Sequence, residues 1–173
     1  MTTVSLTLDE IFELAKKTLL ANGCDDETAS LLSNLIRNAE RDGSVSHGLF
    51  RLPAYISGLK SGKINGKAKP EVKKISSSVI KVQGNNSLAP VVLSKGLPEL
   101  IKATKENGVA VLAINNSHHM AAMWPETEKL AEEGLVAFAC TSYKPAVAPA
   151  GAIKPLFGTN PISLLGLDQE KLL

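Results

Sequence analysis

The chain has 173 residues, of which 44% are hydrophobic and 21% charged, a balance and length typical of one globular domain or of a large and a small lobe. Its net charge is only +2, and no basic run is interleaved with aromatic residues, which argues against binding to nucleic acid or an anionic membrane. Cys24 and Cys140 indicate neither a disulfide framework nor a metal-ligand spacing, and we expect both to be reduced. No signal-peptide pattern and no membrane-spanning apolar stretch occurs, so we expect a cytoplasmic protein.

Three helices are predicted in the first 60 residues. The first covers about 7–22 and begins with a Thr-x-x-Glu capping box. The second covers about 25–42, between an Asn-Gly and an Asp-Gly stop. The third covers 44–59, where Pro53 is expected either to kink the helix or to mark a shifted start.

Beyond a turn-rich connector, the pattern changes from helices to strands, and we place a lobe boundary near residue 70. Two strands, a turn and a helix are predicted next, in the order 71–75, 78–82, Gly84-Asn85-Asn86 and 90–106.

A strand–helix–strand unit follows, formed by the apolar run 109–114, a helix over 121–133 and the apolar run 135–141. Continuous apolar runs of this length predict strands that are buried on both faces. The crossover is long enough for parallel strands, although the pattern does not prove them parallel. The stretch 145–161 is rich in proline and glycine and is predicted to be a long loop, which in a compact domain is usually functional or disordered.

Polar residues on the third predicted helix form a first candidate site. Helical spacing places His47, Arg51 and Tyr55 on one face, with Ser44 and Ser46 as candidate N-caps. Histidine can donate a proton near neutral pH, and arginine can hold a carboxylate through two parallel hydrogen bonds. The combination suits a small carboxylic acid beside a proton donor. Spacing alone favours the alternative of a surface helix whose His and Arg are merely solvated.

The second polar cluster is Asn116-Ser117-His118-His119, between a predicted strand and a predicted helix. Ligands of α/β sheets collect at strand ends, and free N–H groups at a helix start bind anions. The alternative is that one histidine caps the helix and the other points to solvent. We expect no metal site, because neighbouring histidines do not face each other on a helix and no carboxylate or cysteine completes a ligand set.

Other catalytic classes lack their motifs. A hydrolase would have to pair Ser46 or Ser117 with His47 or His119, but no Gly-x-Ser-x-Gly elbow is present. The Gly-x-Gly-x-x-Gly fingerprint and the Walker loop are also missing, so a bound dinucleotide would not use the usual glycine-rich turn.

Four motifs occur in a fixed order along residues 6–164. They are Ser46-His47-Gly48-x-x-Arg51-Leu52-Pro53-x-Tyr55 with Gly62-x-Ile64-Asn65 after it, Asn116-Ser117-x-His119, Val147-Ala148-Pro149-x-Gly151, and Phe157-Gly158-Thr159-Asn160-Pro161. Together they resemble the malate/L-lactate dehydrogenase family, a non-Rossmann family that includes sulfolactate, ureidoglycolate and piperideine-2-carboxylate enzymes.

The resemblance implies an α/β (α+β) fold. A helical lobe over 1–70 would carry the Ser-His-Gly-x-x-Arg motif, and 71–173 would form the N-terminal part of a non-Rossmann, sheet-containing cofactor domain that is incomplete here. It also implies an oxidoreductase that transfers a hydride between NAD or NADP and a small 2-oxo or 2-hydroxy acid, or a cyclic imino acid. A homodimer is expected from the resemblance as well.

The resemblance also assigns roles to residues. His47 would be the acid/base group, oriented by Ser46, and His119 would lie against the nicotinamide, where some members use it for the proton transfer itself. The substrate would contact Arg51, Thr159 and Asn160, and the cofactor would contact His119, Thr141, Ser142 and Tyr143.

The chain departs from the family in two ways. Met120-Ala121 stands where members usually carry Phe-Gly, a change that would alter the pocket without removing a reacting group. Members are also about twice as long, and this difference in length motivates a second hypothesis. The chain could therefore be truncated, or it could be a non-catalytic remnant or a binding subunit that needs a partner. The apolar strands would then expose surface that favours association. The sequence leaves open which acid is the substrate and whether NAD or NADP is used.

Overall fold

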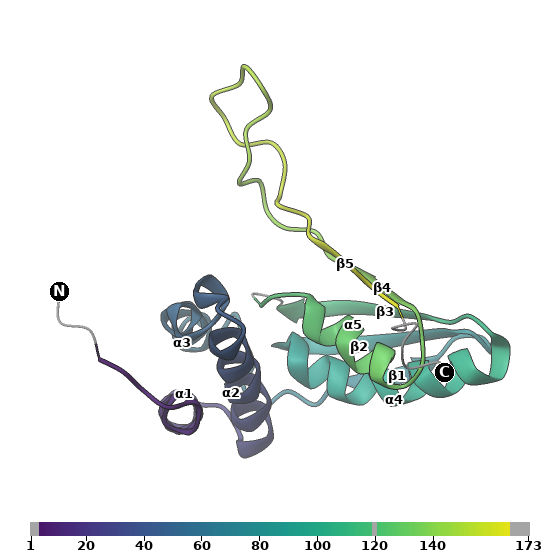
Figure 1. The fold of residues 1–173 in the computed structure, drawn as a ribbon, viewed down its shortest axis with the longest axis horizontal. Coiled ribbons are helices and arrows are strands. Elements are labelled where there is room, and N and C mark those ends of the chain that lie inside the picture. Colours follow the sequence, from purple (N-terminus) through teal and green to yellow (C-terminus); the bar gives the residue numbers. More distant parts are fainter. Residues whose placement is uncertain (1–3, 119–120, 167–173) are drawn as a thin grey trace. The chain divides into compact units, whose positions relative to one another are not determined.

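The computed structural model describes residues 4–118 and 121–166 (Figure 1). The chain divides into two compact units, Met1–Ala121 and Ala122–Leu173, and each is described by itself. Helices come first, followed by helices and small sheets, so the predicted mixed α/β class is confirmed. The proposed pair of lobes that meet near residue 70 stays a prediction.

The first two helices form as their caps predict. Helix α1 (Leu8–Ala21) begins with the capping box, in which the Thr7 hydroxyl accepts from the Glu10 N–H at 3.2 Å and the Thr7 N–H donates to the Glu10 carboxylate at 2.7 Å. Helix α2 (Asp26–Arg41) is capped by Asp25, whose carboxylate accepts from the Thr28 N–H at 2.9 Å. Their apolar faces build the main core of the first unit, which includes Ile11, Ala15, Leu19, Ala29, Leu32, Ile36 and Leu88.

The single third helix that the spacing predicted is wrong. Two 3₁₀ turns, η1 (Val45–His47) and η2 (Leu49–Arg51), precede a shorter helix α3 (Leu52–Lys60). Pro53 marks a shifted start, because a proline without an N–H is tolerated in the first helical turn. Tyr55 is only 1% exposed and belongs to the core, so its phenol does not share a polar face with His47 and Arg51. Burial raises the pKa of this phenol above its ordinary value, against the opposing effect of the Arg51 charge.

A three-stranded sheet completes the first unit, in the order β1 (Glu71–Lys74), β2 (Val79–Leu88) and β3 (Val111–His118). Strand β1 is antiparallel to β2, whereas β3 runs parallel to β2 after the crossover helix α4 (Ala89–Asn107). The predicted turn at Gly84-Asn85-Asn86 is wrong, because these residues lie inside β2, where its register with β3 shifts. Asn85 and Asn86 take left-handed φ values of 51° and 60°, which asparagine tolerates and which suit a bulge as well as a turn.

The second unit contains helix α5 (Trp124–Glu132) and an antiparallel pair, β4 (Ala137–Cys140) and β5 (Ile162–Leu165). The predicted long loop is present, and it links β4 to β5 as an extended arm (Figure 1). The elements of the predicted strand–helix–strand unit form, but β4 pairs with β5, whereas β3 pairs with β2. The Thr127 and Ser163 hydroxyls, 2.7 Å apart, join α5 to β5.

The prediction that the two apolar runs are buried on both faces is wrong for the described residues. Val111 of β3 is 56% exposed and Phe138 of β4 is 62% exposed. Strand β3 is the edge of its sheet and β4 belongs to a two-stranded pair, so each lacks a strand on one side. Apolar composition indicates that a strand tends to be covered, but it does not show what covers it. This exposed surface is the kind that favours association.

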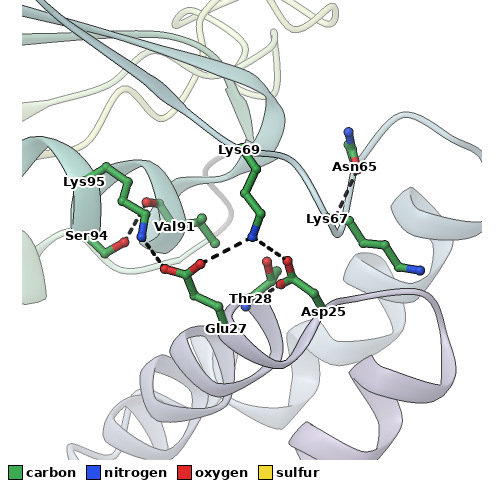
Figure 2. A network of polar contacts seen from close by, with 9 residues as sticks. All are labelled: Asp25, Glu27, Thr28, Asn65, Lys67, Lys69, Val91, Ser94 and Lys95. Carbon is green, nitrogen blue, oxygen red and sulfur yellow. Dashed lines mark hydrogen bonds and ion pairs between the residues drawn. The ribbon is translucent and has the colours of Figure 1, made fainter.

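An ion-pair network joins α2 to the segment before β1 and to α4 (Figure 2). The Lys69 ammonium lies 2.9 Å from the Asp25 carboxylate and 3.5 Å from that of Glu27, and Lys95 pairs with Glu27 as well. Partial burial acts to raise the pKa of Asp25, but the hydrogen bonds from Thr28 and the Lys69 charge outweigh it and lower the pKa to about 2.

Replacing Asp25 with asparagine is expected to reduce the acid sensitivity of folding. Because the pKa of Asp25 is lower in the folded than in the unfolded state, its carboxylate stabilises the protein at pH values above the unfolded pKa of 3.8. This contribution is lost as the pH falls toward the folded pKa of about 2. Because Asp25 is partly exposed, we expect the difference between wild type and Asp25→Asn over this range to be about 1 kcal/mol. Asparagine keeps the helix cap.

Urea unfolding at a series of pH values measures this effect as the free energy of unfolding. Asp26→Asn is the matched control, because it removes a carboxylate from the same helical turn but leaves the Thr28 and Lys69 contacts in place. Equal pH dependence in wild type and Asp25→Asn would contradict the assignment.

Candidate active site

The two 3₁₀ turns between α2 and α3 bring Ser46, His47 and Arg51 together. Their backbone is fixed at the start by the Ser44 N–H, which donates to the Ala39 carbonyl at 2.8 Å. The His47 N–H donates to the Ser44 carbonyl at 2.8 Å, and the Arg51 N–H donates to the Gly48 carbonyl at 3.0 Å. His47 is thus the last residue of η1, and Arg51 is the last residue of η2.

The sequence suggested Ser44 and Ser46 as helix N-caps, but the side chain of Ser44 caps no helix. Both serine hydroxyls lie against the His47 imidazole instead. The His47 Nδ1 atom is 2.9 Å from the Ser46 hydroxyl oxygen and 3.4 Å from that of Ser44. A hydroxyl that donates to Nδ1 leaves the proton of a neutral imidazole on Nε2. This is the contact that an orienting role of Ser46 requires.

Arg51 is anchored through one of its nitrogens. Its Nε–H donates to the Ser46 carbonyl at 2.8 Å, and the side chain is half-buried. Among residues 4–118 and 121–166, no carboxylate forms an ion pair with this guanidinium, in contrast to the network around Lys69. A guanidinium that is fixed at Nε and lacks a counter-charge is suited to a carboxylate ligand at its two terminal nitrogens.

Sequence reasoning missed Glu40, a residue on the last turn of α2. Its carboxylate accepts a hydrogen bond from the Leu49 N–H at 2.7 Å, between the two 3₁₀ turns. A Cβ atom at Gly48 would overlap this carboxylate, so the glycine permits the close approach. The helical pattern gave no signal for Glu40, because a glutamate near a helix end is usually solvated. The one sequence feature linked to this contact is Gly48, where a side chain would meet the carboxylate.

The second predicted cluster lies at the end of β3, and His119 falls outside the described residues. The Ser117 hydroxyl is buried and finds no hydrogen-bond partner within the described chain, and the same holds for the side-chain oxygen of Gln83 on β2. A buried polar atom without a partner needs a ligand or a water. These atoms are therefore compatible with a polar cofactor next to the Asn116-Ser117-x-His119 motif.

The remaining predicted site residues belong to the arm of the second unit. The Tyr143 N–H donates to the Asn160 side-chain oxygen at 3.0 Å, and the Thr141 N–H donates to the Pro161 carbonyl at 3.3 Å. The segment that carries Thr141, Ser142 and Tyr143 therefore lies beside the segment that carries Thr159 and Asn160. Their predicted contacts with cofactor and substrate stay predictions.

Three further observations concern the described residues only. They contain no group of three or more His, Cys, Asp or Glu side chains that could hold a metal ion. None of their helices has the length and apolarity needed to cross a membrane. Neither Cys24, which is buried, nor Cys140, which is exposed, forms a disulfide in this part of the chain.

Known proteins resemble this chain along most of its length. The sequence profile of the malate/L-lactate dehydrogenase family matches residues 6–166. A Δ1-pyrroline-2-carboxylate/Δ1-piperideine-2-carboxylate reductase of Pseudomonas putida is 41% identical over 162 residues, which are 94% of this chain and 48% of that protein. A (2R)-3-sulfolactate dehydrogenase (NADP(+)) of Chromohalobacter salexigens is 39% identical over 91% of this chain and 47% of its own length.

The fold agrees with a solved relative. The crystal structure of Δ1-piperideine-2-carboxylate reductase from Pseudomonas syringae pv. tomato superposes with a TM-score of 0.89 at 39% identity, over 95% of this chain and 50% of that one. The chain therefore spans about half the length of the curated relatives it matches.

Proposed function

Because the chain belongs to the malate/L-lactate dehydrogenase family, we propose that it takes part in the NAD(P)H-dependent reduction of a small carboxylic acid with a C=N or C=O group at C2. The observation that carries this proposal is the arrangement of Ser46, His47 and Arg51. An imidazole held at Nδ1 lies one short turn from an anchored guanidinium that has no carboxylate partner in the described chain. A proton donor beside a carboxylate-binding cation is what such a substrate requires.

His47 is the proposed proton donor. Reduction turns the C=N or C=O double bond into a single bond, with one hydride added to carbon and one proton added to nitrogen or oxygen. A bound NADH or NADPH supplies the hydride. As a general acid His47 acts in its protonated form: it gives up the Nε2 proton to the substrate heteroatom, becomes the neutral imidazole and regains a proton from solvent afterwards, while the Ser46 hydroxyl stays hydrogen-bonded to Nδ1 and so fixes the ring.

Arg51 is the proposed substrate anchor. The terminal nitrogens of its guanidinium would bind both oxygens of the C1 carboxylate, and the Nε bond to the Ser46 carbonyl fixes the direction in which the guanidinium is presented. Because Ser46 also contacts His47, one residue positions both the acid and the anchor. In this proposal C2, which is bonded to the carboxylate carbon, would come within reach of the imidazole.

Cyclic imino acids are the first substrate class to test. The relatives at 38–41% identity include reductases named for Δ1-pyrroline-2-carboxylate and Δ1-piperideine-2-carboxylate, and the sulfolactate relative makes 2-oxo and 2-hydroxy acids the second class. We further propose that His119, Thr141, Ser142 and Tyr143 contact the cofactor and that Thr159 and Asn160 contact the substrate. The Ser117 hydroxyl, which is buried at the end of β3 and has no partner in the described chain, supports the assignment of a cofactor to this motif.

The test uses the chain of 173 residues with NADH and with NADPH. Its substrates are Δ1-pyrroline-2-carboxylate, Δ1-piperideine-2-carboxylate and pyruvate, and oxidation of the cofactor is followed by its absorbance. We expect saturable cofactor binding and a higher rate with a cyclic imino acid than with pyruvate. Failure to bind either cofactor would instead support the alternative of a non-catalytic or partner-dependent binding subunit, to which the exposed apolar strands also point.

A further inference from the structure

We infer that Glu40 is a positioning residue that holds the His47 and Arg51 turns in their working geometry. The inference rests on the proposed function, because it concerns how the proposed acid and anchor are placed. Glu40 touches neither side chain through any hydrogen bond within the described chain. Its carboxylate instead binds the backbone at the junction of the two turns, at the Leu49 N–H.

The junction between η1 and η2 is weakly held by the backbone alone. The Gly48 N–H donates to the Val45 carbonyl at 3.4 Å, which is long for a hydrogen bond, and neither turn receives a side-chain cap from its own N-cap residue. The bond from the Leu49 N–H to the Glu40 carboxylate is shorter, at 2.7 Å. Glu40 therefore ties this junction directly to helix α2.

Gly48 is matched to this contact. The Glu40 carboxylate lies so close to the Gly48 backbone that a Cβ atom would overlap it. An alanine at position 48 would displace the carboxylate and so break the same bond from the opposite side. Two different substitutions, one on α2 and one in the junction, are thus expected to release the same contact.

The role of Glu40 is that of a hydrogen-bond acceptor. No ion pair to Glu40 forms in the part of the chain that the structure describes, so its negative charge does not neutralise a neighbouring cation. A glutamine offers the same side-chain oxygen to the Leu49 N–H, whereas alanine leaves this N–H without its partner. The comparison of Glu40→Gln with Glu40→Ala therefore separates positioning from charge.

The experiment uses calorimetry to measure how tightly the cofactor-loaded chain binds pyrrole-2-carboxylate. This planar carboxylate has an aromatic ring and is not reduced at C2 as a cyclic imino acid would be. Hydrogen exchange of the Leu49 amide and the ¹⁵N shifts of the His47 ring are recorded by NMR. For Glu40→Ala we expect about tenfold weaker binding, faster Leu49 exchange and shifted His47 signals. For Glu40→Gln we expect values within about twofold of wild type.

Gly48→Ala is expected to reproduce the Glu40→Ala result, and the double variant should be no worse than either single variant, because both remove one contact. Glu13→Ala, which removes an exposed glutamate from α1, is the control and should match wild type. Additive losses in the double variant would contradict the inference. So would a Glu40→Gln variant as impaired as Glu40→Ala, or a Glu40→Ala variant that behaves as wild type in all three measurements.

The two proposals fail in different ways. If the wild-type chain does not bind the carboxylate, the proposed function is wrong for this chain. The positioning of His47 is then still decided by the NMR signals, which do not depend on a ligand. Unchanged Leu49 exchange and unchanged His47 shifts in Glu40→Ala overturn the inference whether or not the carboxylate binds.

Discussion

Replacing His47 with asparagine is expected to lower kcat by about 10²- to 10⁴-fold, the range in which general acid catalysis contributes to enzymatic rates. The asparagine amide reaches the position of Nδ1 and can keep a hydrogen bond to Ser46, but it has no group that exchanges a proton near neutral pH. The local turn should therefore survive while proton donation is lost. Binding of the substrate carboxylate through Arg51 should change little, so KM is expected to stay within about threefold.

The measurement is the initial rate of NADPH or NADH oxidation with Δ1-pyrroline-2-carboxylate, over a range of substrate concentrations. Far-ultraviolet circular dichroism and the Leu49 amide exchange rate serve as controls for the fold and for the turn. A variant with near-normal kcat would show that His47 is not the acid, and His119, the other candidate from the family resemblance, would then be tested in the same way. Loss of the Leu49 protection would instead point to a disturbed turn.

Local sequence signals predicted the boundaries of the first two helices well. The Thr7 and Glu10 capping box and the Asp-Gly stop after the second helix each involve residues only a few positions apart, and the structure contains both. A helix boundary depends on local hydrogen bonds, which the sequence specifies directly. The hydroxyl contact of Ser46 to His47 is local in the same sense, since the two residues are neighbours.

The sequence did not predict features that depend on partners far away along the chain. The Gly84-Asn85-Asn86 stretch has the residues of a turn, but pairing with β3 makes it a bulge inside β2. Tyr55 has the spacing of a site residue, but the packing of α1 and α2 draws it into the core. Glu40 was missed because its partner, the Leu49 N–H, is a backbone group nine residues away that no side-chain pattern marks.

Arginine at position 51 should matter most for substrate affinity. Arg51→Met is expected to raise KM by about 100-fold, because the carboxylate loses charge-assisted hydrogen bonds that together contribute about 3 kcal/mol. Arg51→Lys should fall between wild type and Arg51→Met. Lysine restores the charge but neither the bidentate geometry nor the bond from Nε to the Ser46 carbonyl.

The effect on kcat separates an anchor from a group that acts on the reacting atoms. A residue that binds the carboxylate equally in the ground state and in the transition state changes KM and leaves kcat nearly constant. Arg37→Met is the matched control: Arg37 lies 5.6 Å from the centre of the Phe12 ring, where its loss affects packing of α1 and α2 but no proposed site residue. Equal KM values for Arg37→Met and Arg51→Met would contradict the anchor. A large fall in kcat at unchanged KM would instead place Arg51 at the heteroatom that receives the proton.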